Sequence, residues 1–299
     1  MTLPKYVTIR SSFRGACAAV AMAAVPAFAT PFLFSTGPVT DLMASATRPD
    51  TGGVFEIESA DDFVLGSQTQ ISSATFTGLL LGSTPSIGQL VIEIYRVFPL
   101  DSNTVRTPNV PTRANSPSDV ALDSRSSSVA GEMTFATATL ATTFTASNSV
   151  LNGIHAFPNQ LTMGEGAVTG REVQFTVTFT TPLVLPTDHY FFIPQVQVAG
   201  GEFYWLSGTR PLVAPGTPFA PDLQAWIRND ALDPDWLRVG TDIVGGNPVP
   251  TFNGAFTLTG TVAAVPEPAT SALMLLGLAA VGAVARRRQR VRAPSCPPC

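Results

Sequence analysis

Residues 171–180 read REVQFTVTFT. From Val173 to Phe179 every second side chain is apolar, and the side chains between them are Gln or Thr. This alternation predicts a β-strand with one face against an apolar core and the other face in water. A similar alternation recurs in residues 256–262 (FTLTGTV) and, around Glu93, in residues 90–94 (LVIEI).

The sequence around these segments is rich in Thr, Ser, Gly, Pro, Val and Phe and poor in helical periodicity. Turn signals such as Asn152-Gly153 and Gly200-Gly201 separate further strand candidates. About nine short strands of this kind predict an all-β fold, an antiparallel β-sandwich or jelly roll, with the strand order left open. The weaker strand candidates are residues 54–57, 71–77, 133–144, 190–198, 203–206 and 223–228.

Residues 100–131 interrupt this pattern. They carry Pro108, Pro111 and Pro117, a run of serines at 126–128 and few large apolar residues. We expect a long mobile loop inside a single domain that covers residues 30–265. A linker between two domains is the alternative, but residues 30–100 offer few strands for a separate core.

The N-terminus has the order of a secretory signal peptide. Residues 1–14 contain Lys5, Arg10 and Arg14 without an acid, residues 15–25 are uncharged and apolar, and residues 26–29 read PAFA. We expect residues 1–29 to be a signal peptide that is cleaved after Ala29. The apolar run is too short to span a bilayer.

The charge of the exported part excludes one class of partner. Residues 30–265 hold nine Arg, no Lys and twenty acids, a formal charge of −11 that the whole-chain value of −4 hides. An acidic, Lys-free surface repels phosphate backbones, so we expect no nucleic-acid partner. Cys17, Cys296 and Cys299 all lie outside residues 30–265, which predicts a fold without disulfides.

The C-terminus combines a short polar motif, an apolar run and a basic cluster. Residues 265–268 read VPEP, residues 269–285 are seventeen residues without a charge, and residues 286–292 read RRRQRVR. A helix of seventeen residues is about 25 Å long, which is short but workable for a bilayer core of about 30 Å. The basic cluster predicts a stop-transfer signal with a cytoplasmic tail at residues 293–299. The prolines predict an extended segment just outside the membrane.

A plain membrane anchor would need only the helix and the basic cluster. The addition of Val265, Pro266, Glu267 and Pro268, in this order and spacing, closely resembles the PEP-CTERM sorting domain, here residues 266–292 with the transmembrane helix at 269–285 and the stop-transfer residues Arg286, Arg287 and Arg288. One departure is the extra tail after the basic cluster. The resemblance implies an exosortase as partner, transient retention in the inner membrane, and delivery to the cell surface or an exopolysaccharide matrix.

The body itself resembles, in residues 60–63 and 222–228, uncharacterised β-rich domains that often precede this sorting signal. It contains no Gly-x-Ser-x-Gly elbow, no His-Glu-x-x-His zinc site and no phosphate loop. Of the two histidines, His189 follows Asp188, where a solvated turn is the expected environment and a catalytic pair the alternative. We expect a non-enzymatic structural or adhesive protein, with no cofactor.

Two groups of residues leave alternatives open. Asp230, Asp233 and Asp235 could ligate calcium, with turn-capping acids as the simpler interpretation, and the same holds for Asp61-Asp62. Trp205, Trp226 and Trp236 could be a glycan-stacking surface of a lectin-like module, with core packing as the simpler interpretation. A glycoside hydrolase is the less favoured alternative, because the sequence selects no carboxylate pair.

Overall fold

The computed structural model describes residues 30–51, 53–102, 114–155, 157, 160–209, 223–263, 277–284, 286 and 287. These residues fall into two units. Residues Ala29–Ala264 form a β unit, and the two ends of the chain form the second unit. Each unit is described by itself.

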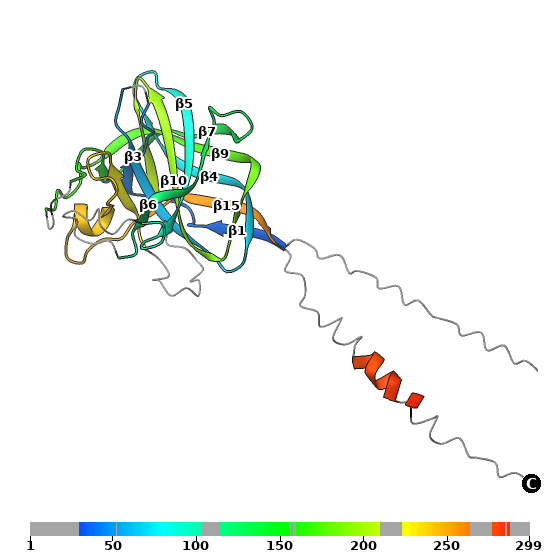
Figure 1. The fold of residues 1–299 in the computed structure, drawn as a ribbon. Helices are drawn as coiled ribbons and strands as arrows, with labels where there is room; N and C mark the ends of the chain where they lie inside the picture. The colour runs from blue at the N-terminus through cyan, green and yellow to red at the C-terminus, as the bar shows by residue number, and fades with distance from the viewer. Residues whose placement is uncertain are drawn as a thin grey trace, which may run out of the picture. The chain divides into compact units, whose positions relative to one another are not determined.

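The larger sheet of the β unit contains nine of the described strands (Figure 1). Its central strand, β4, pairs with β9 along one edge and with β15 and β11 along the other. All its pairs are antiparallel except that of β2 with β8. Its strands are β1 (Thr30–Ser35), β2 (Val39–Ala46), β4 (Thr69–Leu81), β7 (Met133–Ala146), β8 (Ser149–Val150), β9 (Val168–Leu185), β11 (Glu202–Gly208), β14 (Asn253–Gly254) and β15 (Phe256–Val262).

The smaller sheet contains six of the described strands, all antiparallel, in the order β13-β12-β3-β10-β5-β6. Strands β3, β10 and β5 lie in its middle, and β12 joins β3 at the side that leads to β13. The strands are β3 (Ile57–Leu65), β5 (Ser86–Val97), β6 (Pro117–Ser126), β10 (Asp188–Ala199), β12 (Trp226–Asn229) and β13 (Leu237–Arg238).

An aromatic core joins the two sheets. The apolar residues of the 171–180 segment are buried in it, as their alternation predicts. Phe175 of β9 stacks on Phe76 of β4 with ring centroids 4.9 Å apart. Phe192 of the smaller sheet stacks on Phe256 of the larger sheet at 5.0 Å, so the sheets meet face to face. The prediction of an all-β fold is therefore confirmed.

The middle strands of the smaller sheet are buried on both faces. Its second face, which points away from the aromatic core, is covered by an apolar cluster that includes Phe191, Trp226 and Trp236. Strands buried on both faces read as continuous apolar runs. Residues 190–193 (YFFI) are such a run in β10, and all four side chains are buried.

The loop prediction for residues 100–131 is wrong for residues 117–126, which form β6 and pair with β5. Strand β6 reads PSDVALDSRS and is half-exposed at the edge of its sheet, so it lacks the apolar alternation that reveals a strand. Strands β1 and β2 also escape prediction. The candidate at residues 54–57 begins too early, because β3 starts at Ile57 and continues to Leu65.

One close approach within the larger sheet requires glycine. A Cβ atom on Gly254 of β14 would lie 2.3 Å from a ring carbon of Trp205. The indole Nε1 of Trp205 donates a hydrogen bond to the carbonyl of Ala255, 3.0 Å away. Glycine therefore lets the tryptophan ring lie flat against the backbone of β14.

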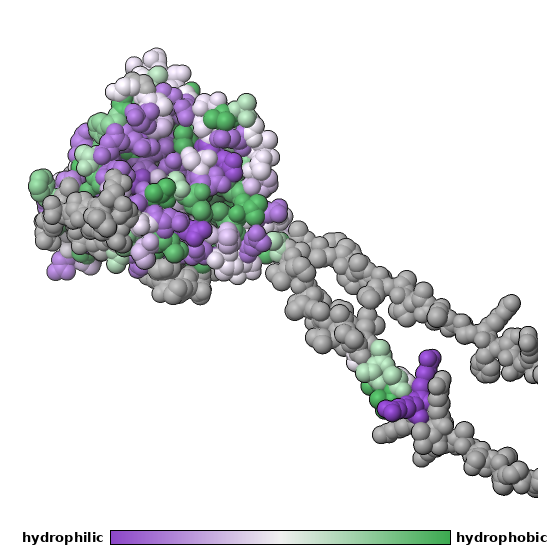
Figure 2. Space-filling model, in the orientation of Figure 1, coloured by the Kyte–Doolittle hydropathy of each residue, from purple (hydrophilic) through white to green (hydrophobic). Residues whose placement is uncertain are grey.

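The surface of the β unit mixes residue types. On the face in view in Figure 2, hydrophilic and hydrophobic residues are interspersed. In the second unit, residues 277–284, 286 and 287 are helical, and their side chains are exposed. Within the described residues, no helix is both long and apolar enough to cross a membrane.

Candidate functional site

A buried polar network lies on the second face of the smaller sheet. Arg228 of β12 is the register partner of Glu58 of β3, and its Nε donates a short hydrogen bond to the Glu58 carboxylate. The same guanidinium lies 4.4 Å from the centroid of the Trp236 ring and donates to Asp233 at 2.8 Å. Arg228 thus connects β12 to β3 and to the segment that follows β12.

Tyr95 of β5 extends this network across the sheet. Its hydroxyl donates to Glu58 Oε1 at 2.9 Å and approaches Glu93 Oε2 at 3.2 Å, and it accepts from the Arg228 guanidinium at 2.8 Å. The side-chain amide of Gln195 on β10 donates a hydrogen bond to Glu56, just before β3, at 2.6 Å. Strands β3, β5 and β12 thus contribute to one set of hydrogen bonds, and the Gln195–Glu56 pair lies beside it.

Burial and mutual repulsion perturb these carboxyl groups. Burial, with the charge of Glu58 as the second cause, raises the pKa of Glu93 to about 8. The same two causes, in the same order, raise the pKa of Glu56. Burial alone would lower the pKa of Arg228, but Glu58 and Tyr95 outweigh it, so the pKa of the guanidinium is raised. At neutral pH Glu93 therefore retains its proton.

Three of these carboxylates have the spacing of a metal site. One oxygen from each of Glu56, Glu58 and Glu93 lies within 4.8 Å of the other two. Calcium takes oxygen ligands of this kind. Groups of the protein already neutralise part of this negative charge, because Arg228 pairs with Glu58 and Glu93 holds a proton. Two of the three carboxylates are therefore neutralised without a cation.

The calcium interpretation of Asp230, Asp233 and Asp235 is wrong for the arrangement in the structure. Asp233 is bound to Arg228, Asp235 is fully buried, and Asp230 is exposed. The carboxylates that do converge are glutamates from β3, β5 and the segment just before β3. In this turn the three acids lie in different environments, so their proximity in sequence does not bring their carboxylates together.

The solvated-turn interpretation of His189 is also wrong. His189 of β10 is buried, and its Nε2 lies 2.7 Å from Asp62 Oδ2 of β3. The other oxygen of Asp62 accepts a hydrogen bond from the Leu223 backbone N–H at 2.9 Å. The neighbouring Asp61 accepts from the Gly254 backbone N–H at 2.9 Å. These acids therefore anchor later segments of the chain to β3.

The three tryptophans do not form a glycan-stacking surface, because each is only 1–3% exposed. Trp205 packs in the aromatic core, and Trp226 and Trp236 pack over the second face of the smaller sheet. Core packing, the simpler interpretation, is the correct one. The indole N–H groups of Trp226 and Trp236 donate to the carbonyls of Leu223 and Ser118, at 3.1 and 3.3 Å.

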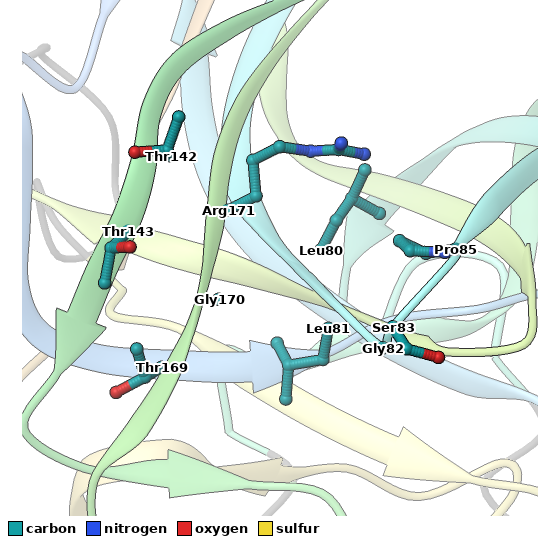
Figure 3. A pocket seen from close by; sticks show the side chains of 10 residues that line it. All are labelled: Leu80, Leu81, Gly82, Ser83, Pro85, Thr142, Thr143, Thr169, Gly170 and Arg171. Atoms are coloured by element: carbon teal, nitrogen blue, oxygen red, sulfur yellow. The ribbon is translucent and has the colours of Figure 1, made fainter.

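A solvent-open groove of about 360 Å³ lies where β4 turns toward β5 (Figure 3). Strand β9 forms its floor at Gly170, where a Cβ atom would come within 2.8 Å of the Leu80 carbonyl oxygen. Threonines from β7 and β9 lie on one side, and the Arg171 side chain extends along the other. No acid among the described residues pairs with this guanidinium. The lining residues are Leu80, Leu81, Gly82, Ser83, Pro85, Thr142, Thr143, Thr169, Gly170 and Arg171.

One feature of the sequence indicates the buried network. Glu93 stands inside an apolar run, residues 90–95 (LVIEIY), where a charged side chain needs a partner. Its hydrogen-bond partners include Tyr95, two residues along the same strand, and Glu58 of β3, which lies far away in the sequence. No signal pointed to the groove, because threonines in strands are common.

Most of the candidate sorting residues lie outside the described residues. Val265, Pro266, Glu267, Pro268 and Arg288 are among them, as are residues 269–276 and 285 of the apolar run. Of the run and the basic cluster, residues 277–284, Arg286 and Arg287 are described, and they are helical.

The comparison with known protein families decides the identity of this segment. Residues 264–289 match the PEP-CTERM protein-sorting motif. The PEP-CTERM motif covers the Pro-Glu-Pro tripeptide, the apolar run and the start of the basic cluster. It implies an exosortase as the processing partner and export from the cytoplasm. Neither the curated proteins nor the solved structures contain a match to the chain.

Proposed function

We propose that this chain is an exported protein of the cell surface or exopolysaccharide matrix, sorted by an exosortase, with a structural or adhesive role. The match of residues 264–289 to the PEP-CTERM motif carries this proposal. The β unit of the same chain holds all but one of the acids and no cysteine.

In this proposal the two ends of the chain act one after the other. Residues 1–29 direct export and are removed. Residues 269–285 then hold the protein in the inner membrane as a transmembrane helix, and Arg286, Arg287 and Arg288 keep the C-terminal side in the cytoplasm. The Pro-Glu-Pro segment stays extended on the outer side, where an exosortase acts on it.

We further propose that the β unit is not an enzyme. Its most perturbed acid, Glu93, is occupied in a buried network with Tyr95 and Glu58, and His189 is buried against Asp62. In both places the polar groups connect strands that are distant in the sequence. This use of buried polar groups suits a robust binding or structural module.

Substitution of the tripeptide tests the sorting proposal. We expect Pro266→Ala, Glu267→Ala and Pro268→Ala together to leave an uncleaved, membrane-bound protein, whereas the parent is processed. Neutral replacement of Arg286, Arg287 and Arg288 should instead weaken membrane retention and topology. Membrane fractionation and intact mass distinguish the two variants. Equal mass and equal fractionation of the tripeptide variant and the parent would leave only a plain anchor.

A lectin-like module is the second candidate, and the groove of Figure 3 favours it. Its hydroxyl groups and the Arg171 guanidinium could bind an anionic sugar, since guanidinium groups recognise carboxylates in a bidentate manner. We expect Arg171→Ala to abolish retention on immobilised acidic polysaccharide. Arg125→Ala, which removes an arginine paired with Asp123 on β6, is the matched control. Equal retention of both variants would refute the groove as a sugar site.

A further inference from the structure

Strand β7 forms a free edge of the larger sheet. It pairs with β9 on one side, and no other described strand pairs with it (Figure 1). Its regular register runs from Met133 opposite Phe179 to Thr139 opposite Val173. The backbone groups on the opposite side of Met133–Thr139 therefore face solvent within the described part of the chain, because an edge strand leaves half its ladder unpaired.

The second half of β7 is irregular, and the residue after its end bonds to β2. The register with β9 shifts after Thr139 and again after Ala141, and such bulges bend a strand. Beyond the strand end, the Ser147 N–H donates to the Asp41 carbonyl of β2 at 2.6 Å. The free edge is thus limited to the regular segment, Met133–Thr139, in which residues 134 and 136–139 are exposed.

This edge lacks the features that normally protect an edge strand. Natural edges are short, or carry charges, prolines or inward-turned bulges. The regular segment of β7, Met133–Thr139 (MTFATAT), carries no charge, proline, glycine or register shift. The other described edges differ: β6 contains Pro117, Asp119, Asp123 and Arg125, β1 has six residues with Pro31, and β8 and β13 have two residues each.

We propose that Met133–Thr139 pairs antiparallel with the same segment of a second copy of the chain, so that two larger sheets become one continuous sheet. The exported part has a formal charge of −11, so most surfaces of two copies repel each other. The β7 edge has no charge and is therefore compatible with itself. Antiparallel pairing about Ala136 places the threonines of one copy, at 134, 137 and 139, opposite Ala138, Phe135 and Met133 of the other.

The size of the segment sets the strength of the association. A strand of seven residues is small beside the roughly 1,600 Å² of a standard interface. Pairing is therefore weak in dilute solution and increases with concentration, as in a crowded surface layer. A two-fold interface of this kind closes on itself, so it yields dimers and not open filaments.

Cysteine cross-linking tests the geometry. In the full chain in detergent, with Cys17, Cys296 and Cys299 replaced by Ser, Ala136→Cys places two thiols opposite each other across the two-fold axis. We expect a disulfide-linked dimer on mild oxidation, because opposite residues of an antiparallel pair have Cβ atoms about 5 Å apart. The control is Val120→Cys on the charged edge strand β6, where the native side chain is 61% exposed. Equal dimer yields from the two variants would overturn the proposal.

A charge at the same position tests the energetics. We expect Ala136→Lys to weaken the self-association measured by sedimentation equilibrium by about tenfold or more, because two like charges meet at the axis. Val120→Lys should associate like the parent. Near-UV circular dichroism verifies that both variants keep the native fold. Unchanged self-association of a folded Ala136→Lys variant would refute the pairing, and neither experiment depends on the exosortase.

Discussion

Arg228 of β12 lies directly opposite Glu58 of β3, and their side chains form an ion pair in which the two groups are only 6% and 4% exposed. Strand β12 has four residues and pairs with β3 on one side and β13 on the other. The ion pair, together with Trp226, fixes this short strand to the sheet. Both Glu58 and Arg228 also form hydrogen bonds with the Tyr95 hydroxyl, so the pair links β3 and β12 to β5.

Removal of one partner of the Arg228–Glu58 pair should lower the free energy of unfolding. Arg228→Met leaves Glu58 buried without a counter-charge, and such a change costs about 3–5 kcal/mol in the free energy of unfolding. Urea denaturation measures the loss. The control is Arg125→Met, which breaks an Arg125–Asp123 pair with side chains 25% and 27% exposed and should cost less than about 1 kcal/mol. Similar losses in the two variants would contradict the buried network.

The stability should depend on pH through Glu93. Its pKa is raised from 4.5 to about 8, so between these values the folded state holds a proton that the unfolded state has released. The stabilisation is fully present below pH 4.5 and is lost as the pH rises through 8, with a slope of at most about 1.4 kcal/mol per pH unit. We expect Glu93→Gln to flatten this slope in urea denaturation series. Parallel curves for the parent and the variant would show that Glu93 titrates normally.

Gly254 should tolerate no side chain. Gly254→Ala places a methyl group 2.3 Å from the Trp205 ring carbon, and overpacking of this kind costs about 1–3 kcal/mol. The thermal midpoint should fall, and the near-UV signal of the tryptophan should change. Gly66→Ala is the matched control, because a Cβ atom there meets no atom within 4 Å. A neutral Gly254→Ala variant would mean that β14 and Trp205 lie farther apart.

Folding of the β unit should be independent of redox conditions. Residues 30–263 contain no cysteine, so the three core clusters and the hydrogen bonds between strands hold the two sheets together without a disulfide. The thermal midpoint of the exported protein should not change when a reductant is added. A decrease of several degrees would place a disulfide inside the folded unit and contradict the assigned boundaries.

The fold class was predictable where one face of a strand is buried and the other is wet. Residues 171–180 and 256–262 alternate, and they form parts of β9 and all of β15. Strand β6 escaped prediction because it lies at a sheet edge, where neither face needs an apolar row. The pairing of β12 with β3 was also invisible, since the residues that match in register lie about 170 positions apart.

The sequence by itself determined the sorting signal and the β class, because both depend on the order and spacing of neighbouring residues. The Pro-Glu-Pro motif, the apolar run and the arginines are read along the chain, and so is the period of a strand. Only the tertiary structure decided that the tryptophans are core residues, that Glu58 meets Arg228, and that β7 is a free edge. Burial and pairing depend on which distant strands become neighbours, and that choice is made by the packing of the whole domain.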